Sequence, residues 1–75
     1  HPREVFGPVL RHPQPVASLL FVHNHPSGDP TPSDDDTAIT QQLAKAGKIF
    51  GILILDHVII GTNGRLFSFR DQGLL

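Results

Sequence analysis

A capped helical segment between two apolar segments is the feature that most constrains the fold of this chain. The run Val16–Val22 is almost entirely apolar, which favours a strand that is buried on both faces. The apolar run Ile49–Ile60, interrupted at Gly51 and Asp56-His57, is too rich in β-branched residues and too closely flanked by turns to favour a helix. It predicts one strand, or two strands with a bend at Asp56-His57. Strand, helix and strand in this order predict an α/β layer fold.

The segment between the two runs carries the signals of a helix that begins at Ser33. Ser33 is a favourable N-cap residue, and Asp34, Asp35 and Asp36 occupy the first turn, where the helix dipole favours anions. Apolar residues then recur at helical spacing, at Ile39, Leu43 and Ala46. We expect the helix to end at Gly47, because glycine readily adopts the left-handed conformation that terminates helices.

The rest of the chain divides at the prolines, all seven of which lie within the first 32 residues. Residues 3–12 have apolar residues at helical spacing, but Pro8 predicts a short or kinked helix. Residues 26–33 are all turn formers and predict a loop. Asn63-Gly64 predicts a hairpin turn into a short strand, Leu66–Phe69. The expected order is helix, strand, helix, strand, strand.

The size and composition of the chain limit what it can be. Its 75 residues suffice for one small domain, residues 1–75, and such chains bury only about 60% of the surface that they expose when unfolded. It has no cysteine, so any metal must be bound through nitrogen and oxygen. No apolar run approaches the ~18 residues of a membrane span, and we expect a cytoplasmic protein with no membrane partner. The abrupt start at His1-Pro2, without a Met, predicts a piece excised from a longer polypeptide.

The charge pattern does not favour a nucleic-acid partner. The formal net charge is −1, and the six basic residues are scattered along the chain. Domains that bind nucleic acids usually cluster their Lys and Arg residues on one face.

Three potential metal ligands follow one another at fixed spacing: His23, His25 and, eleven residues later, Asp36. Two histidines at i and i+2 on a strand point to the same face, so both rings can reach one ion at about 2.0 Å. A third ligand from another element leaves the fourth tetrahedral position to water, which is the arrangement of a catalytic zinc site.

Each part of this pattern also has a structural interpretation. His23 and His25 are also what a polar strand end would contain. Ser33 and Asp36 resemble a capping box, and acidic residues are common in a first helical turn. Two other zinc motifs are excluded, because a deaminase needs cysteine ligands and a zincin needs His-Glu-x-x-His on a helix.

The combined pattern is more specific than its parts. His-x-His-Pro followed by Ser-x-x-Asp, with seven residues between His25 and Ser33, resembles the JAMM motif of the JAB/MPN metalloprotease fold. The stretch His23–Ser33 resembles, more narrowly, the RadC family of bacterial proteins. This likeness extends to three other segments: His1–Phe6, Leu55–Gly61 and Gly73–Leu75.

The resemblance implies a cytidine-deaminase-like α/β fold, a mixed sheet with flanking helices. It also implies a Zn²⁺ ion on His23, His25 and Asp36, with the Ser33 hydroxyl assisting catalysis. The implied function is a zinc-dependent peptidase or isopeptidase whose substrate is unknown. The alternative is a DNA-repair-associated accessory protein with a structural or nuclease-like metal site.

Two further residues bear on the site. The JAMM motif requires an upstream glutamate as general base, and the only glutamate, Glu4, lies in the opening helical segment. The resemblance also implies a truncated domain whose upstream strands are missing. We therefore assign no catalytic glutamate and expect the base upstream of residue 1. His57 is expected to be structural, as half of a buried hydrogen-bonded pair with Asp56. The sequence does not indicate an oligomeric state.

Overall fold

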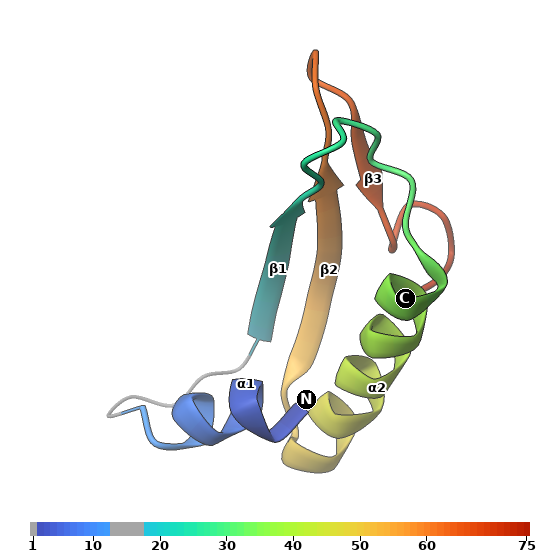
Figure 1. The fold of residues 1–75 in the computed structure, drawn as a ribbon. Helices are drawn as coiled ribbons and strands as arrows, with labels where there is room; N and C mark the ends of the chain where they lie inside the picture. The colour runs from blue at the N-terminus through green and yellow to red at the C-terminus, as the bar shows by residue number, and fades with distance from the viewer. Residues whose placement is uncertain (1, 13–17) are drawn as a thin grey trace.

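The computed structural model describes residues 2–12 and 18–75, which form a mixed sheet with two helices. The elements are α1 (Pro2–Leu10), β1 (Ser18–Asn24), α2 (Asp34–Phe50), β2 (Leu53–Ile60) and β3 (Leu66–Ser68). β1 and β2 are parallel and are joined through α2, whereas β3 runs antiparallel to β2 (Figure 1). The predicted α/β class and element order are confirmed. Neither described helix is long and apolar enough to cross a membrane.

α2 begins where the sequence predicts, but it does not end at Gly47. The helix continues to Phe50, and Gly51 caps it in the left-handed conformation at φ 71°. Gly47 is instead a packing position, because a Cβ atom there would lie 2.5 Å from the carbonyl oxygen of Ile52. Its missing side chain lets the helix approach the chain that leads into β2. Ile49 and Phe50, which we expected in a strand, therefore belong to α2.

β2 is a single strand with one extra residue near its middle. Leu19 pairs with Ile54, whereas Leu20 pairs with Asp56, so Leu55 has no partner in β1. Such a bulge reverses the alternation of side chains along a strand. Ile54 before it and His57 after it are therefore both buried on the same side. Of the two expected arrangements, the structure therefore shows one strand, and its irregularity is a bulge at Leu55, one residue before Asp56-His57.

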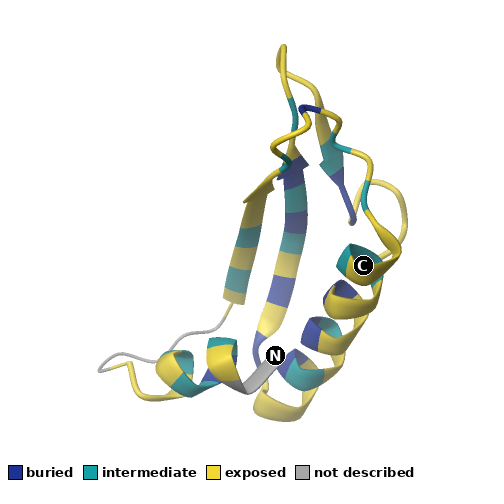
Figure 2. Ribbon diagram, viewed as in Figure 1, coloured by how far each residue is buried: buried dark blue, intermediate teal, exposed yellow. Residues whose placement is uncertain are grey.

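The core lies where both helices meet one face of the sheet. Phe6, Leu43, Ile52 and Ile54 form its centre, and Leu19 and Phe21 of β1 pack against it. β1 is not buried on both faces as we expected. Leu20 and Val22 point the other way and are 57% and 59% exposed, because the described helices pack only against the face that carries Leu19 and Phe21 (Figure 2). Val16 and Ala17, which we also expected in this strand, lie outside the described residues.

The hairpin between β2 and β3 forms as predicted. Asn63 and Gly64 both have positive φ, 56° and 72°, which is typical of a turn between antiparallel strands. β3 ends at Ser68, and the adjacent Phe69 is fully buried. The hairpin extends beyond the end of β1 and lies beside the loop that leads to α2 (Figure 1).

Candidate metal centre

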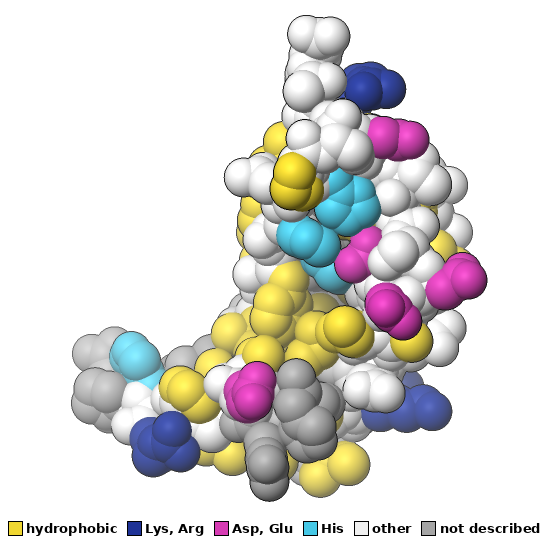
Figure 3. Space-filling model, in the orientation of Figure 1, with side chains coloured by type: hydrophobic (Ala, Val, Ile, Leu, Met, Phe, Trp, Pro, Cys, Tyr) yellow, Lys and Arg dark blue, Asp and Glu magenta, His cyan; other side chains and the backbone are white. Residues whose placement is uncertain are grey.

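The structure brings the three predicted ligands together at the carboxyl end of β1. His23 is in β1, His25 follows it directly, and Asp36 is in the first turn of α2. Their ligand atoms all lie within 4.8 Å of one another. The distances are 3.1 Å from His25 Nε2 to Asp36 Oδ2 and 3.8 Å from His23 Nδ1 to Asp36 Oδ1. Figure 3 shows histidine and acidic side chains side by side on one face of the molecule.

The two histidines converge because the chain stays extended through both of them. His23 pairs with Ile59 in the parallel ladder, and the His25 N–H donates to the Ile60 carbonyl at 3.2 Å. Alternation along the strand then places both rings on the side of α2. Their centroids are 4.8 Å apart and the rings are nearly perpendicular.

Asp36 is fixed by a reciprocal capping box. Its N–H donates to Ser33 Oγ at 3.0 Å, and the Ser33 N–H donates to Asp36 Oδ2 at 2.9 Å. Burial acts to raise the pKa of Asp36, but hydrogen bonds from Ser33 and the nearby His25 and His23 outweigh it and lower the pKa. Asp36 is therefore both the capping-box residue and a candidate ligand, and capping holds its carboxylate ionised and in place.

His25 has a hydrogen bond that determines which ring nitrogen faces the cluster. Its Nδ1 lies 2.9 Å from the carbonyl oxygen of Asp29, which can only accept, so Nδ1 carries the proton. In a neutral ring, Nε2 then presents a lone pair to Asp36 Oδ2 at 3.1 Å. Two acceptors at this distance need a cation between them, either a second ring proton or a metal ion. Metal-bound histidines commonly donate their other N–H to a carbonyl in this way.

The spacing of the donors fits a small divalent ion. A tetrahedral zinc ion with bonds of about 2.0–2.1 Å separates its ligand atoms by roughly 3.3 Å. The observed distances are 3.1 Å from His25 to Asp36 Oδ2 and 3.8 Å from His23 to Asp36 Oδ1, and all three ligand atoms lie within 4.8 Å of one another. Two imidazoles and a carboxylate are a donor set that zinc accepts, and small shifts of the His23 ring, whose side chain is 43% exposed, would complete the site.

The loop after His25 is held by the β2–β3 hairpin. The Gly28 N–H closes a turn on the His25 carbonyl at 2.9 Å, and the Thr62 N–H donates to the Gly28 carbonyl at 2.9 Å. A Cβ atom on Gly61 would lie 2.2 Å from that carbonyl oxygen. The two backbones therefore meet only because residue 61 is glycine.

Asp56 and His57 are hydrogen-bonded as expected, but through the His57 backbone and not its ring, because neighbouring strand residues point to opposite faces. Asp56 accepts from the backbone N–H of His57 at 2.7 Å and from the hydroxyl of Ser68. The His57 ring lies on the other face, where Nδ1 is 2.7 Å from the hydroxyl oxygen of Thr40. Burial, followed by the nearby His23, lowers the pKa of His57. Thr40 was not predicted as a functional residue, because its only signal in the sequence is a polar residue on the apolar face of α2.

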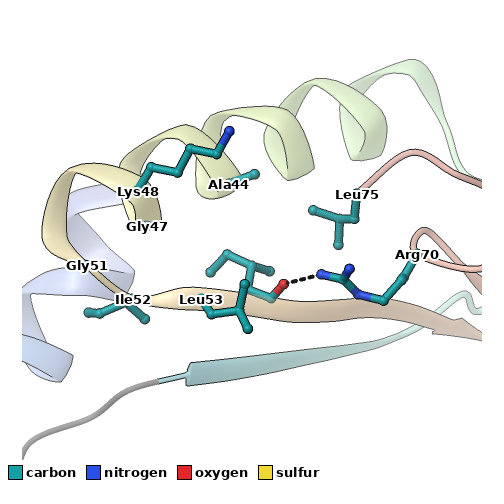
Figure 4. Close-up of a pocket in the computed structure, with 9 residues that line it drawn as sticks. Ala44, Gly47, Lys48, Gly51, Ile52, Leu53, Arg70 and Leu75 are labelled. Atoms are coloured by element: carbon teal, nitrogen blue, oxygen red, sulfur yellow. Dashed lines mark hydrogen bonds between the residues drawn. The ribbon is translucent and has the colours of Figure 1, made fainter.

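Two cavities lie beside α2. One, of about 250 Å³, adjoins the metal centre, and its lining includes His23, His57 and six other residues: Val5, Phe21, Val22, Ile39, Gln42 and Leu43. The other, of about 410 Å³, lies between the end of α2 and β2 (Figure 4). Its lining includes Lys48 and Arg70, and the Arg70 guanidinium donates to the Ile54 carbonyl at 2.8 Å. None of the three candidate ligands lines this larger cavity.

The chain is similar to a family of known proteins. A family model described as a RadC-like JAB domain matches residues 1–74. A UPF0758 protein of Trichlorobacter lovleyi is 56% identical over the whole chain, which covers 31% of that relative. UPF0758 proteins of Methanococcoides burtonii and Listeria monocytogenes are 52% and 53% identical over 100% and 97% of the chain, again covering 31% of each relative. The chain thus spans about a third of the length of these curated relatives.

Proposed function

The chain belongs to the RadC-like JAB domain family, and we propose that it carries the metal centre of a zinc-dependent peptidase or isopeptidase. The observation that supports this most is the contact between His25 Nε2 and Asp36 Oδ2, two acceptors 3.1 Å apart once Nδ1 is protonated. Zinc between them would satisfy both atoms and leave a position for water.

The proposed chemistry divides between the ion and the residues around it. When bound, zinc supplies a water acidified to a pKa of about 7 and a Lewis acid for a scissile carbonyl. Ser33 is the proposed oxyanion donor. Its Oγ accepts from the Asp36 N–H, so its own proton is available to an oxygen that gains charge as an amide is attacked. Donors of this kind contribute roughly 2.7–4 kcal/mol to transition-state stabilisation.

The proposed mechanism also needs a general base, which the cluster of His23, His25 and Asp36 does not include. Glu4 lies in α1 and is not among the candidate ligands that the structure groups together. The relatives are about three times as long as this chain. We propose that a glutamate outside the 75 residues supplies the base.

Metal analysis of the purified protein tests the ligand set. We expect about one zinc per chain in the parent and a sharp loss in His25→Ala and Asp36→Ala. Asp35→Ala is the matched control, because Asp35 is in the same helical turn but outside the cluster. Full zinc content in both ligand variants would refute the assignment.

The reaction type needs a separate assay. In a longer protein that contains the proposed base, zinc-dependent hydrolysis of peptide or isopeptide bonds that disappears in Asp36→Ala would support the proposal. Hydrolysis of phosphodiester bonds without any amide hydrolysis would instead favour the nuclease-like alternative. The face in Figure 3 carries its Lys and Arg side chains far apart, which does not support a nucleic-acid substrate.

A further inference from the structure

We propose that Arg65 is a positioning residue for the metal centre, a role that rests on the proposed zinc site. Arg65 is in the β2–β3 hairpin, and Nη2 of its guanidinium donates to the carbonyl of Gly28 at 2.8 Å. Gly28 belongs to the loop that follows His25. This contact holds the loop that orients His25, so that the hairpin sets the affinity of the metal site.

The guanidinium is held at more than one point. Besides the Gly28 carbonyl, its Nε donates to the Thr62 carbonyl at 3.3 Å, and Nη2 lies 3.3 Å from the Thr62 hydroxyl. Two donors on one rigid plane therefore connect the hairpin turn to the loop. A lysine has a single nitrogen at the end of a flexible chain and cannot reproduce this geometry.

The carbonyl that binds Arg65 and the carbonyl that binds the His25 ring belong to adjacent residues, Gly28 and Asp29. The Gly28 carbonyl is part of the peptide that leads into Asp29, and the Asp29 carbonyl accepts from His25 Nδ1 at 2.9 Å. The Gly28 N–H donates to the His25 carbonyl at 2.9 Å. Gly28 therefore binds the backbone of His25, and Asp29 binds its ring. Movement of the Gly28 carbonyl therefore changes the direction in which His25 Nε2 points.

The loop and the hairpin approach each other so closely that a side chain at Gly28 or Gly61 would not fit. A Cβ atom on Gly28 would lie 2.8 Å from the Thr62 methyl carbon, and one on Gly61 would lie 2.2 Å from the Gly28 oxygen. Gly28 also has a φ of 84°, which favours glycine. The loop and the hairpin tip lie side by side at the same end of the sheet (Figure 1).

The test compares Arg65→Ala and Arg65→Lys with the parent protein. Zinc affinity is measured by competition with a chelator, and Co²⁺ replaces zinc as a spectroscopic probe of ligand geometry. We expect Arg65→Ala to weaken zinc binding about 10- to 100-fold, the usual effect of losing a residue that orients a ligand. Its Co²⁺ absorption bands should also shift. Arg65→Lys should fall between the alanine variant and the parent.

Gly64→Ala separates positioning from loss of hairpin stability. Gly64 has a φ of 72°, so alanine strains the turn, but an added Cβ there meets nothing within 4 Å. We expect this variant to lower the melting temperature of the metal-free protein while zinc affinity and the Co²⁺ spectrum stay unchanged. If Arg65→Ala does not fold, Arg65→Lys must still show weaker binding than the parent.

Two outcomes would overturn the inference while leaving the zinc site intact. One is an unchanged zinc affinity and Co²⁺ spectrum in both Arg65 variants. The other is a loss of affinity in Gly64→Ala as large as that in Arg65→Ala. If the parent itself binds neither zinc nor cobalt, the proposed function is refuted and the role of Arg65 is refuted with it.

Discussion

Nδ1 of His57 lies 2.7 Å from the hydroxyl oxygen of Thr40, and that hydroxyl lies 2.7 Å from the carbonyl oxygen of Asp36. A hydroxyl has one proton, and a carbonyl can only accept it. The Thr40 proton therefore goes to Asp36, and His57 Nδ1 must donate to Thr40. β2 is in this way connected, through one buried hydroxyl, to the helical turn that presents the candidate carboxylate ligand.

Replacing Thr40 with valine should destabilise the fold. The substitution keeps the shape of the side chain but leaves the N–H of the buried His57 without an acceptor, which costs about 1–3 kcal/mol. Urea unfolding monitored by circular dichroism measures the change. Thr37→Val is the matched control on the same helix, because its hydroxyl bonds the Ser33 carbonyl at 3.3 Å in a more exposed place. Equal losses in the two variants would contradict the special role of Thr40.

Asp56 should make the stability of the fold depend on pH. Burial acts to raise its pKa, but hydrogen bonds from Ser68, Arg70 and the His57 backbone outweigh it, so the pKa of Asp56 is lowered. A lowered folded pKa stabilises the native state above the unfolded value of about 3.9, and this contribution disappears as the pH falls through the folded value.

The comparison of parent and Asp56→Asn isolates this contribution. We expect the parent to be the more stable of the two near neutral pH, with a difference in unfolding free energy that narrows as the pH falls below about 3.9. Denaturant titrations over this range provide the measurement. A difference that stays constant down to the acid limit would show that the charge of Asp56 is not what matters.

Features encoded by neighbouring residues were predictable from the sequence. The cap at Ser33, the Asn63-Gly64 turn and the order of strands and helices depend on local preferences. The His23 and His25 rings converge because strand alternation is a property of the backbone. Asp36 joins them because a capped first turn fixes where its carboxylate lies.

Features that depend on contacts between distant residues were not predictable in this way. Gly47 has the same local signal whether it ends a helix or lets it approach the Ile52 carbonyl. The bulge at Leu55 exists because β2 has one residue more than the facing part of β1. The contact of Arg65 with Gly28 joins residues 37 positions apart, and no spacing rule relates them.

Gly61→Ala should disturb both stability and the loop after His25. The added methyl group would meet the Gly28 carbonyl oxygen at 2.2 Å, so one backbone must move, at a cost of about 1–3 kcal/mol. Gly7→Ala is the same chemical change in helix α1, where the nearest atoms belong to the flexible Arg11 side chain. It should be neutral or stabilising, since alanine favours helix. Thermal melts compare the two variants, and a harmless Gly61→Ala would disprove the close contact.

Two substitutions at Ser33 separate its capping role from its proposed catalytic role. Alanine at an N-cap costs typically about 1 kcal/mol, whereas glycine costs only a few tenths. Both remove the hydroxyl, so in a longer protein that also contains the proposed general base both should lower the turnover number about 10²- to 10³-fold if Ser33 stabilises the oxyanion. The expected result is thus two variants with different melting temperatures but similar turnover. Activity that instead follows stability would leave Ser33 with the capping role alone.

Zinc should stabilise the folded protein only through the intact ligand set. A ligand that binds the native state at 100 times its dissociation constant adds about 2.7 kcal/mol, which in a domain of this size raises the melting temperature by on the order of 10 °C. Asp36→Asn is the informative variant, because an amide oxygen can still accept from the Ser33 N–H and keep the cap, while the ligand charge is lost. We expect the metal-free variant to melt near the parent and to gain little from zinc, whereas Asp35→Asn gains as much as the parent does. A zinc-induced shift of equal size in the parent and in Asp36→Asn would mean that the ion binds elsewhere.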